Sequence, residues 1–198
     1  MIKGAKGWRG TMPQCDDHPV AIVVMGVSGA GKSAVGQGLA ERLGWRFAEG
    51  DALHPARNVA KMKSGQPLTD ADRAPWLAAV AQVIGTWRHR GEHGVITCSA
   101  LKKAYRQQIS DRGDVRLVFL EGPREVIAGR VGTRQGHFMP PTLLDSQFAT
   151  LEPPGPDENP ITVGINRPVE GVIESIIGAL GSPAQSQRSA RSNLGDKT

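Results

Sequence analysis

The chain has 198 residues, enough for one well-packed α/β domain and too few for two domains of ordinary size. Its formal net charge is +5, yet residues 21–182 hold 18 basic and 16 acidic side chains, so most of the surplus lies in the tails. A face that binds the phosphate backbone of a nucleic acid would need a larger basic surplus. We therefore expect no nucleic-acid partner.

The two ends of the chain differ in composition from its middle. Residues 1–19 are rich in glycine and polar side chains and lack the apolar core of a signal peptide, and residues 182–198 hold too few apolar side chains to offset the entropy cost of ordering. No stretch approaches the roughly 20 apolar residues of a membrane span. The chain has only two cysteines, Cys15 and Cys98, so we expect no disulfide framework. We predict a flexible extension at 1–19, a domain at 20–181 and a disordered tail at 182–198, in a cytoplasmic protein without a membrane partner.

A glycine-rich motif follows the first strand-like run. Residues 20–25 are apolar without interruption, as expected of a central parallel strand that is covered on both faces. Residues 26–33 then read Gly-Val-Ser-Gly-Ala-Gly-Lys-Ser, a complete G-x-x-x-x-G-K-S phosphate loop (P-loop), and an amphipathic helical pattern follows up to Gly44. In such a loop the backbone N–H groups surround an anion, and the helix dipole adds positive potential. The motif therefore predicts a site for a nucleoside triphosphate.

The roles within the P-loop follow from this geometry. We expect Lys32 to reach the β and γ phosphates of ATP and Ser33 to ligate Mg²⁺. The candidate nucleotide-binding residues of the loop are Gly26, Val27, Ser28, Gly29, Ala30, Gly31, Lys32 and Ser33.

Strand-like and helical patterns alternate along the rest of the domain. Further strands are predicted at 45–48, 95–98, 115–120 and 161–165, and helices at 75–90, 100–110, 123–134 and 168–181. Each parallel connection must cross over the sheet, so this alternation builds a five-stranded parallel sheet with helices on both faces. Ligands of such a fold bind at the carboxyl ends of the strands. Polar clusters follow the strands at 49–55 and 99–102, and an arginine-rich segment follows the fourth strand, so we expect an active site there.

These polar segments resemble those of the gluconate kinases, the sugar-acid branch of the small P-loop kinases related to shikimate kinases. The matching blocks include Gly50-Asp51-Ala52-Leu53-His54-Pro55, the segment 67–77, Cys98-Ser99-Ala100-Leu101-Lys102, 137–140, Ser146-Gln147 and 151–154, in the same order. The resemblance covers about residues 20–180. It implies an α/β, P-loop NTPase-type three-layer fold with a small lid, and ATP-dependent phosphorylation of D-gluconate at its 6-hydroxyl to give 6-phosphogluconate and ADP. It also implies a homodimer.

Phosphoryl transfer needs cations and a placed carboxylate. Asp51 is the candidate to accept the proton of the substrate hydroxyl or to orient that hydroxyl, and it could help to hold Mg²⁺ through water. The alternative is that Asp51 caps a helix that starts near Pro55. Ser99 stands after the third strand, where many P-loop enzymes keep an aspartate linked to Mg²⁺, so the partners of the metal are left open.

The substrate pocket should pair a cation with hydrogen-bonding groups, because gluconate is a polyol with a carboxylate. By position and by family resemblance, the candidate substrate-binding residues are Asp51, His54, Arg73, Lys102, Arg106 and His137. Each cation could instead be a solvated surface charge, and His54 could instead make a structural hydrogen bond beside Pro55.

Residues 130–138 have the features of a lid. Arg130 and Arg134 are one helical turn apart, so both could approach the transferred phosphoryl group, and Gly132 and Gly136 supply bending freedom. The alternative is a solvated basic helix end that stabilises its own dipole. After the fifth strand, Asn166 and Arg167 are expected to border the adenine.

Other functions remain open at this point. The chain lacks the N-K-x-D element of a GTPase and the paired aspartates and triple glycine of the shikimate kinases. The remaining alternatives are a kinase for another small hydroxy acid and a regulatory protein that binds a nucleotide without turnover.

Overall fold

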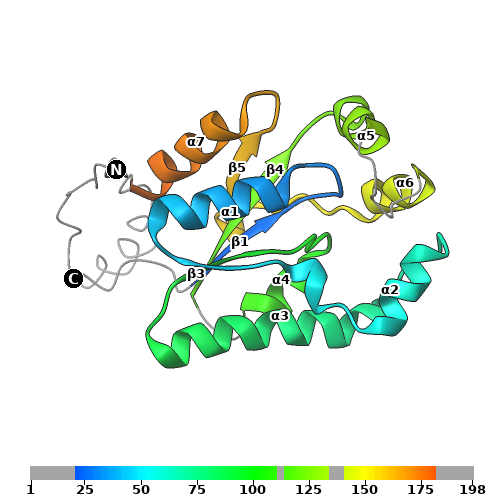
Figure 1. Cartoon of the computed structure of the whole chain (residues 1–198), viewed down its shortest axis with the longest axis horizontal. Coiled ribbons are helices and arrows are strands. Elements are labelled where there is room, and N and C mark those ends of the chain that lie inside the picture. The colour runs from blue at the N-terminus through cyan, green and yellow to red at the C-terminus, as the bar shows by residue number, and fades with distance from the viewer. Residues whose placement is uncertain (1–20, 111–113, 134–140, 182–198) are drawn as a thin grey trace, which may run out of the picture.

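The computed structural model describes residues 21–110, 114–133 and 141–181. Their central element is a parallel sheet with the strand order β2-β3-β1-β4-β5 (Figure 1). The strands are β1 (Ala21–Met25), β2 (Arg46–Ala48), β3 (Gly94–Thr97), β4 (Val115–Glu121) and β5 (Ile161–Gly164). Each lies within two residues of its predicted position, and the α/β fold with five parallel strands is confirmed.

Helices cover both faces of the sheet, as predicted. Helices α1 (Lys32–Leu43) and α7 (Val169–Gly181) pack on one face, and α3 (Asp70–Arg90) and α4 (Lys103–Ser110) pack on the other (Figure 1). Alternate residues of β1 supply the two cores: Ile22 packs with the first helix layer and Val23 with the second. All five residues of β1 are fully buried. The central strand is therefore anchored on both sides before it enters the P-loop.

The P-loop turns back toward α1 through left-handed glycines. Gly26, Gly29 and Gly31 have φ angles of 139°, 84° and 95°, a region that glycine adopts without steric cost. A Cβ on Gly26 would also lie 2.9 Å from the carbonyl oxygen of Leu120 on β4. Helix α1 ends at Gly44, which is left-handed as predicted, and its N–H caps carbonyls of the last turn.

Helix α3 starts five residues earlier than predicted. Its N-cap is Thr69, whose hydroxyl accepts a hydrogen bond from the Asp72 N–H, while the Asp72 carboxylate accepts one from the Thr69 N–H. This capping box satisfies two backbone donors, so the helix begins at Asp70 and Pro75 lies inside it. The expectation that Pro75 marks the helix start was wrong.

The remaining helices lie between these elements. They are α2 (Ala56–Lys63), α5 (Arg124–Thr133), α6 (Pro141–Thr150) and the short 3₁₀ turns η1 (Gly50–Leu53) and η2 (Pro156–Glu158). Helix α6 was not predicted, and α4 begins at Lys103 because Ala100 has a positive φ of 44°. No helix within 21–110, 114–133 and 141–181 is long and apolar enough to cross a membrane.

Arg106 of α4 is a structural residue, which corrects its predicted role in substrate binding. Its guanidinium is buried and donates to both carboxylate oxygens of Glu158, at 2.6 and 2.8 Å. It also donates to the carbonyl oxygens of Ala100, Leu101 and Glu152, at 3.1, 3.3 and 2.9 Å. The hydrogen bond from Arg106 holds the pKa of Glu158 below its ordinary value. The side chain thus joins α4 to the segment before β5.

We predict that Arg106→Met lowers the free energy of unfolding by about 3–5 kcal/mol, because it leaves the carboxylate of Glu158 without its buried partner. The matched control is Lys103→Met, three residues before Arg106 on the same helix. It removes an exposed ion pair with Asp157 and should have little effect. Urea denaturation of both variants checks the prediction, and equal midpoints would contradict it.

Candidate active site

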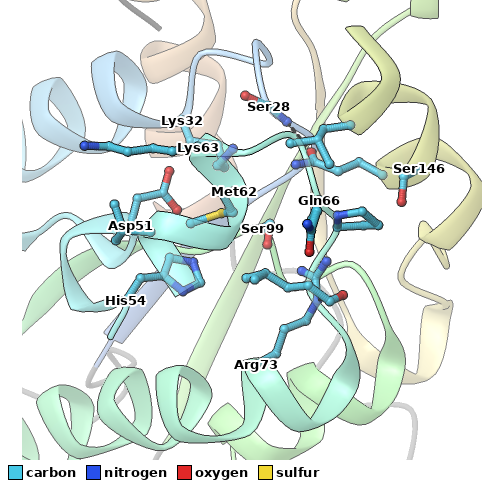
Figure 2. Close-up of a pocket in the computed structure, with 15 residues that line it drawn as sticks. Ser28, Lys32, Asp51, His54, Met62, Lys63, Gln66, Arg73, Ser99 and Ser146 are labelled. Carbon is cyan, nitrogen blue, oxygen red and sulfur yellow. Dashed lines mark hydrogen bonds between the residues drawn. The ribbon is translucent and has the colours of Figure 1, made fainter. Parts of the chain in front are cut away.

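A cavity of about 280 Å³ lies at the carboxyl ends of the strands. The P-loop, η1, α2, the start of α3 and α6 supply its walls (Figure 2). Four of the predicted catalytic or substrate-binding residues line it: Lys32, Asp51, His54 and Arg73. The first and last of these residues, Lys32 of α1 and Arg73 of α3, are 41 residues apart in the sequence, and the structure brings them to one cavity.

The P-loop forms one wall of the cavity. The Lys32 ammonium donates a hydrogen bond to the Val27 carbonyl at 3.0 Å, within its own loop. Ser33, in the first turn of α1, is exposed. The N–H of Ser28 donates to Oε1 of Gln147 on α6 at 2.7 Å. Helix α6 is thus hydrogen-bonded to the loop that is expected to hold phosphates.

Asp51 lies on η1, directly after β2, and faces the cavity (Figure 2). The N-cap of α2 is Pro55, and that helix has no side-chain cap. Asp51 therefore does not cap α2, and the structural alternative for this residue does not hold. Its carboxylate is exposed toward the same cavity as Lys32.

His54 makes structural contacts, and its predicted contact with the substrate stays a prediction. Its ring stacks on Trp76, with the centroids 4.2 Å apart and the planes 15° apart, and its Nδ1 lies 3.5 Å from the Asn58 amide nitrogen. It also lines the cavity. Burial lowers the pKa of His54, the nearby Asp51 raises it and Arg73 lowers it again, for a net shift below the ordinary 6.5. The imidazole is therefore mainly neutral at pH 7.

The three candidate cations for a carboxylate are in different places. Arg73 of α3 lines the cavity, with its Nε 3.4 Å from the Leu68 carbonyl and its guanidinium 5.9 Å from the centroid of the Tyr105 ring. Lys102 does not line the cavity: its ammonium donates to both carboxylate oxygens of Asp70 at 2.8 Å. Arg106 is buried in the interaction with Glu158 described above.

The carboxylate of Asp70 accepts hydrogen bonds from two side chains, Lys102 and Tyr105. Hydrogen bonds from Lys102 and Tyr105 hold the pKa of Asp70 below its ordinary value. Lys102 therefore has a local partner, and its predicted contact with substrate would require it to leave that partner.

Several residues of the cavity were not among the predicted site residues. Lys63, Gln66, Ser146 and Gln147 add polar groups, and an apolar wall also borders the cavity. Ser146-Gln147 did appear in the family resemblance, which was the signal that could have identified them. The apolar wall consists of Val59, Met62, Pro67, Leu68 and Leu143.

The predicted lid is described only in part. Arg130 of α5 is exposed and its Nη2 donates to the Ile165 carbonyl at 2.9 Å, while Arg134 and His137 lie outside the described residues. After β5, Asn166 and Arg167 are exposed, and Arg167 donates to the Ser175 hydroxyl on α7 at 3.0 Å. The lid and adenine roles of these residues stay predictions.

Cys98, which directly follows β3, is an internal residue. It is fully buried, and burial raises the pKa of its thiol to about 12. The thiol is therefore protonated at neutral pH. Ser99, the next residue, lines the cavity.

Comparisons with known proteins agree with this architecture. Residues 22–154 match the family described as "AAA domain". The chain is 52% identical to the gluconokinase of Gluconobacter oxydans (strain 621H) over 162 residues, which are 80% of this chain and 90% of the relative. It is 44% identical to the thermoresistant gluconokinase of Escherichia coli (strain K12) over 163 residues, which are 81% and 93% of the two chains.

A solved structure extends the likeness to three dimensions. The crystal structure of a gluconokinase from Sinorhizobium meliloti 1021 matches with a TM-score of 0.75 and 44% identity, over 82% of this chain and 91% of that chain. The APS kinase of Mycobacterium tuberculosis, at 19% identity and a TM-score of 0.60 over 82% of this chain and 97% of that chain, shares the fold alone. The P-loop, the strand order and the extent of these matches together show that the chain belongs to the gluconokinase family of small P-loop kinases.

Proposed function

We propose that this chain transfers the γ-phosphoryl group of ATP to the 6-hydroxyl of D-gluconate, giving 6-phosphogluconate and ADP. The observation that carries the proposal is the shared cavity of Lys32, Asp51 and Arg73. A phosphate-binding cation, a carboxylate suited to a hydroxyl and a cation suited to an acid thus border one space. Membership in the gluconokinase family supports the same substrate pair.

The nucleotide would bind on the P-loop. The backbone N–H groups of the P-loop and the N-terminus of α1 form a cradle for the phosphates. The ammonium of Lys32 now donates to a carbonyl within the loop and has further N–H groups to offer to the β and γ phosphates. Since Lys32 borders the cavity, the γ phosphate would face the acceptor.

Mg²⁺ would be held by few protein groups. Within the described residues, no set of three or more His, Cys, Asp or Glu is gathered as a metal cage. Mg²⁺ bound with ATP needs only one or two protein oxygens besides phosphates and water, and the exposed hydroxyl of Ser33 and the carboxylate of Asp51 fit this need. When bound, the ion would neutralise charge on the β and γ phosphates.

The acceptor would be oriented by three residues of the cavity. Asp51 would accept a hydrogen bond from the 6-hydroxyl and then its proton as the new P–O bond forms. Arg73 would bind the carboxylate of the sugar acid through two N–H groups. The neutral ring of His54 would hydrogen-bond to one of the hydroxyl groups of gluconate.

Further features belong to the same proposal. The apolar wall would exclude water from the γ phosphate, and closure of a lid that carries Arg130, Arg134 and His137 would complete the exclusion. The homodimer and the cytoplasmic location stay predictions.

We expect ADP formation to require gluconate and Mg²⁺, because water is excluded from the closed site. A coupled ADP assay with gluconate, shikimate, glycerate and nucleoside monophosphates tests both alternatives at once. Lys32→Ala should abolish turnover and serves as the control for contaminating kinases. Comparable ADP release without any sugar acid would instead identify a regulatory ATPase, and a preference for another acid would change the substrate.

For Arg73→Ala we predict that the KM for gluconate rises about 10–100-fold while the KM for ATP changes little, because a charge-assisted hydrogen bond contributes about 1.5–3 kcal/mol. Steady-state kinetics with each substrate varied in turn measure the split. Arg90→Ala, at the far end of the same helix, is the matched control. Unchanged gluconate kinetics in Arg73→Ala would place this residue among the surface charges.

The pKa of His54 should respond to its two charged neighbours with opposite signs. Asp51→Asn removes a charge that raises this pKa, so the value should fall, and Arg73→Ala removes a charge that lowers it, so the value should rise. NMR titration of the imidazole measures both shifts. Because the folded-state pKa lies below 6.5, the stability linked to this group is present above pH 6.5 and is lost as the pH falls through the folded value. Identical titrations in both variants would show that the ring does not face Asp51 and Arg73.

A further inference from the structure

The peptide groups that precede Asp51 are held from two sides by buried side chains. The N–H of Gly50 donates a hydrogen bond to the hydroxyl oxygen of Thr97 at 3.0 Å. The carbonyl oxygen of Gly50 accepts one from the indole N–H of Trp76 at 2.7 Å. Thr97 and Trp76 are each 1% exposed, so water does not compete for either hydrogen bond.

These two hydrogen bonds join three different elements. Thr97 is the last residue of β3, Trp76 belongs to the second turn of α3, and Gly50 is the first residue of η1. The Gly50 carbonyl is part of the peptide group that links Gly50 to Asp51. Trp76 therefore restrains the peptide group that joins Gly50 to Asp51.

The hydroxyl of Thr97 has a defined orientation. It donates its proton to the carboxylate of Glu49 and accepts the N–H of Gly50. Both functions of one buried hydroxyl are thus used on the two residues before Asp51. A hydroxyl with both functions satisfied has little freedom to rotate.

Gly50 lies too close to β3 for any side chain to fit at this position. A Cβ at this position would lie 1.9 Å from the carbonyl oxygen of Thr97, so the backbone of η1 lies directly against β3. Only glycine permits an approach this close. The turn that carries Asp51 is consequently fixed by backbone contact as well as by the two hydrogen bonds.

We propose that Thr97 and Trp76 are positioning residues that hold the Asp51 carboxylate at the acceptor hydroxyl through the clamped Gly50 backbone. Neither residue lines the cavity, so neither acts on the substrate directly. The inference rests on the proposed role of Asp51 in phosphoryl transfer. It adds the reason why a carboxylate on a short 3₁₀ turn keeps one position relative to the P-loop.

Trp76 has a second contact that must be separated from the first. Its ring stacks on His54, so complete removal of the side chain would disturb two cavity residues at once. Trp76→Phe keeps an aromatic ring for stacking and removes the indole donor. Thr97→Val keeps the shape of the side chain and removes the hydroxyl.

We expect kcat to fall about 10–100-fold in Thr97→Val and in Trp76→Phe, because a small displacement of a reacting group has an effect of this size. The KM for ATP should stay within about twofold, since the P-loop is untouched. Thr97→Ser keeps the hydroxyl and should therefore retain most of the kcat of the parent enzyme. Thr86→Val, which removes an exposed threonine hydroxyl on α3, is the matched control and should resemble the parent enzyme. Urea denaturation of each variant sets an assay temperature at which all are folded.

A double-mutant cycle with Asp51→Asn provides the decisive readout. If Thr97 acts through Asp51, Thr97→Val lowers kcat in the parent enzyme and has little further effect in Asp51→Asn. Equal losses in both backgrounds, or an unchanged kcat in both Thr97→Val and Trp76→Phe, would overturn the positioning role while leaving the proposed function intact. Full activity of Asp51→Asn would instead overturn the catalytic assignment of Asp51, and with it this inference.

Discussion

The whole site depends on the complete burial of strand β1. Its five residues are enclosed between two helix layers, and its backbone is paired with β3 on one side and β4 on the other. The strand ends at Met25, and Gly26 follows it directly against the backbone of β4. Because the sheet is parallel, the ends of β2 and β3 lie at the same edge. The P-loop, Asp51 and Ser99 therefore border one cavity without any long loop to bring them together.

Burial and partners, and not residue type, decide what each cation does. Arg73 and Arg106 have identical side chains, but Arg106 is enclosed by a carboxylate and three carbonyls, whereas Arg73 borders the cavity. The two therefore divide into a stabilising residue and a candidate for substrate recognition. Lys102 lies between these cases, because it does not line the cavity and its charge is paired with the exposed carboxylate of Asp70. A similar division applies to Trp76, which is a core residue by burial and yet contacts both η1 and His54.

Predictions from the sequence were accurate where the signal was local. The five strands and the end of α1 at Gly44 were located because apolar runs and a left-handed glycine are properties of neighbouring residues. The predicted start of α3 at Pro75 was wrong because the capping box of Thr69 and Asp72 starts the helix at Asp70. Helix α6 was missed, although its Gln147 touches the P-loop. Of the candidate site, five residues that line the cavity were identified in advance, namely Ser28, Lys32, Asp51, His54 and Arg73, whereas Arg106 is buried away from it.

The sequence by itself determined the P-loop, the strand pattern and the family, because these follow from contiguous residues and from blocks in a set order. Only the tertiary structure decided which side chains face the cavity. Arg106 is hydrogen-bonded to Glu158, 52 residues away in the sequence. Gly50 is hydrogen-bonded to Thr97 at the end of β3, 47 residues away, and Ser28 to Gln147 of α6, 119 residues away. No local pattern encodes such pairs, since each exists only after the sheet and its helix layers have brought distant segments together and removed water from between them.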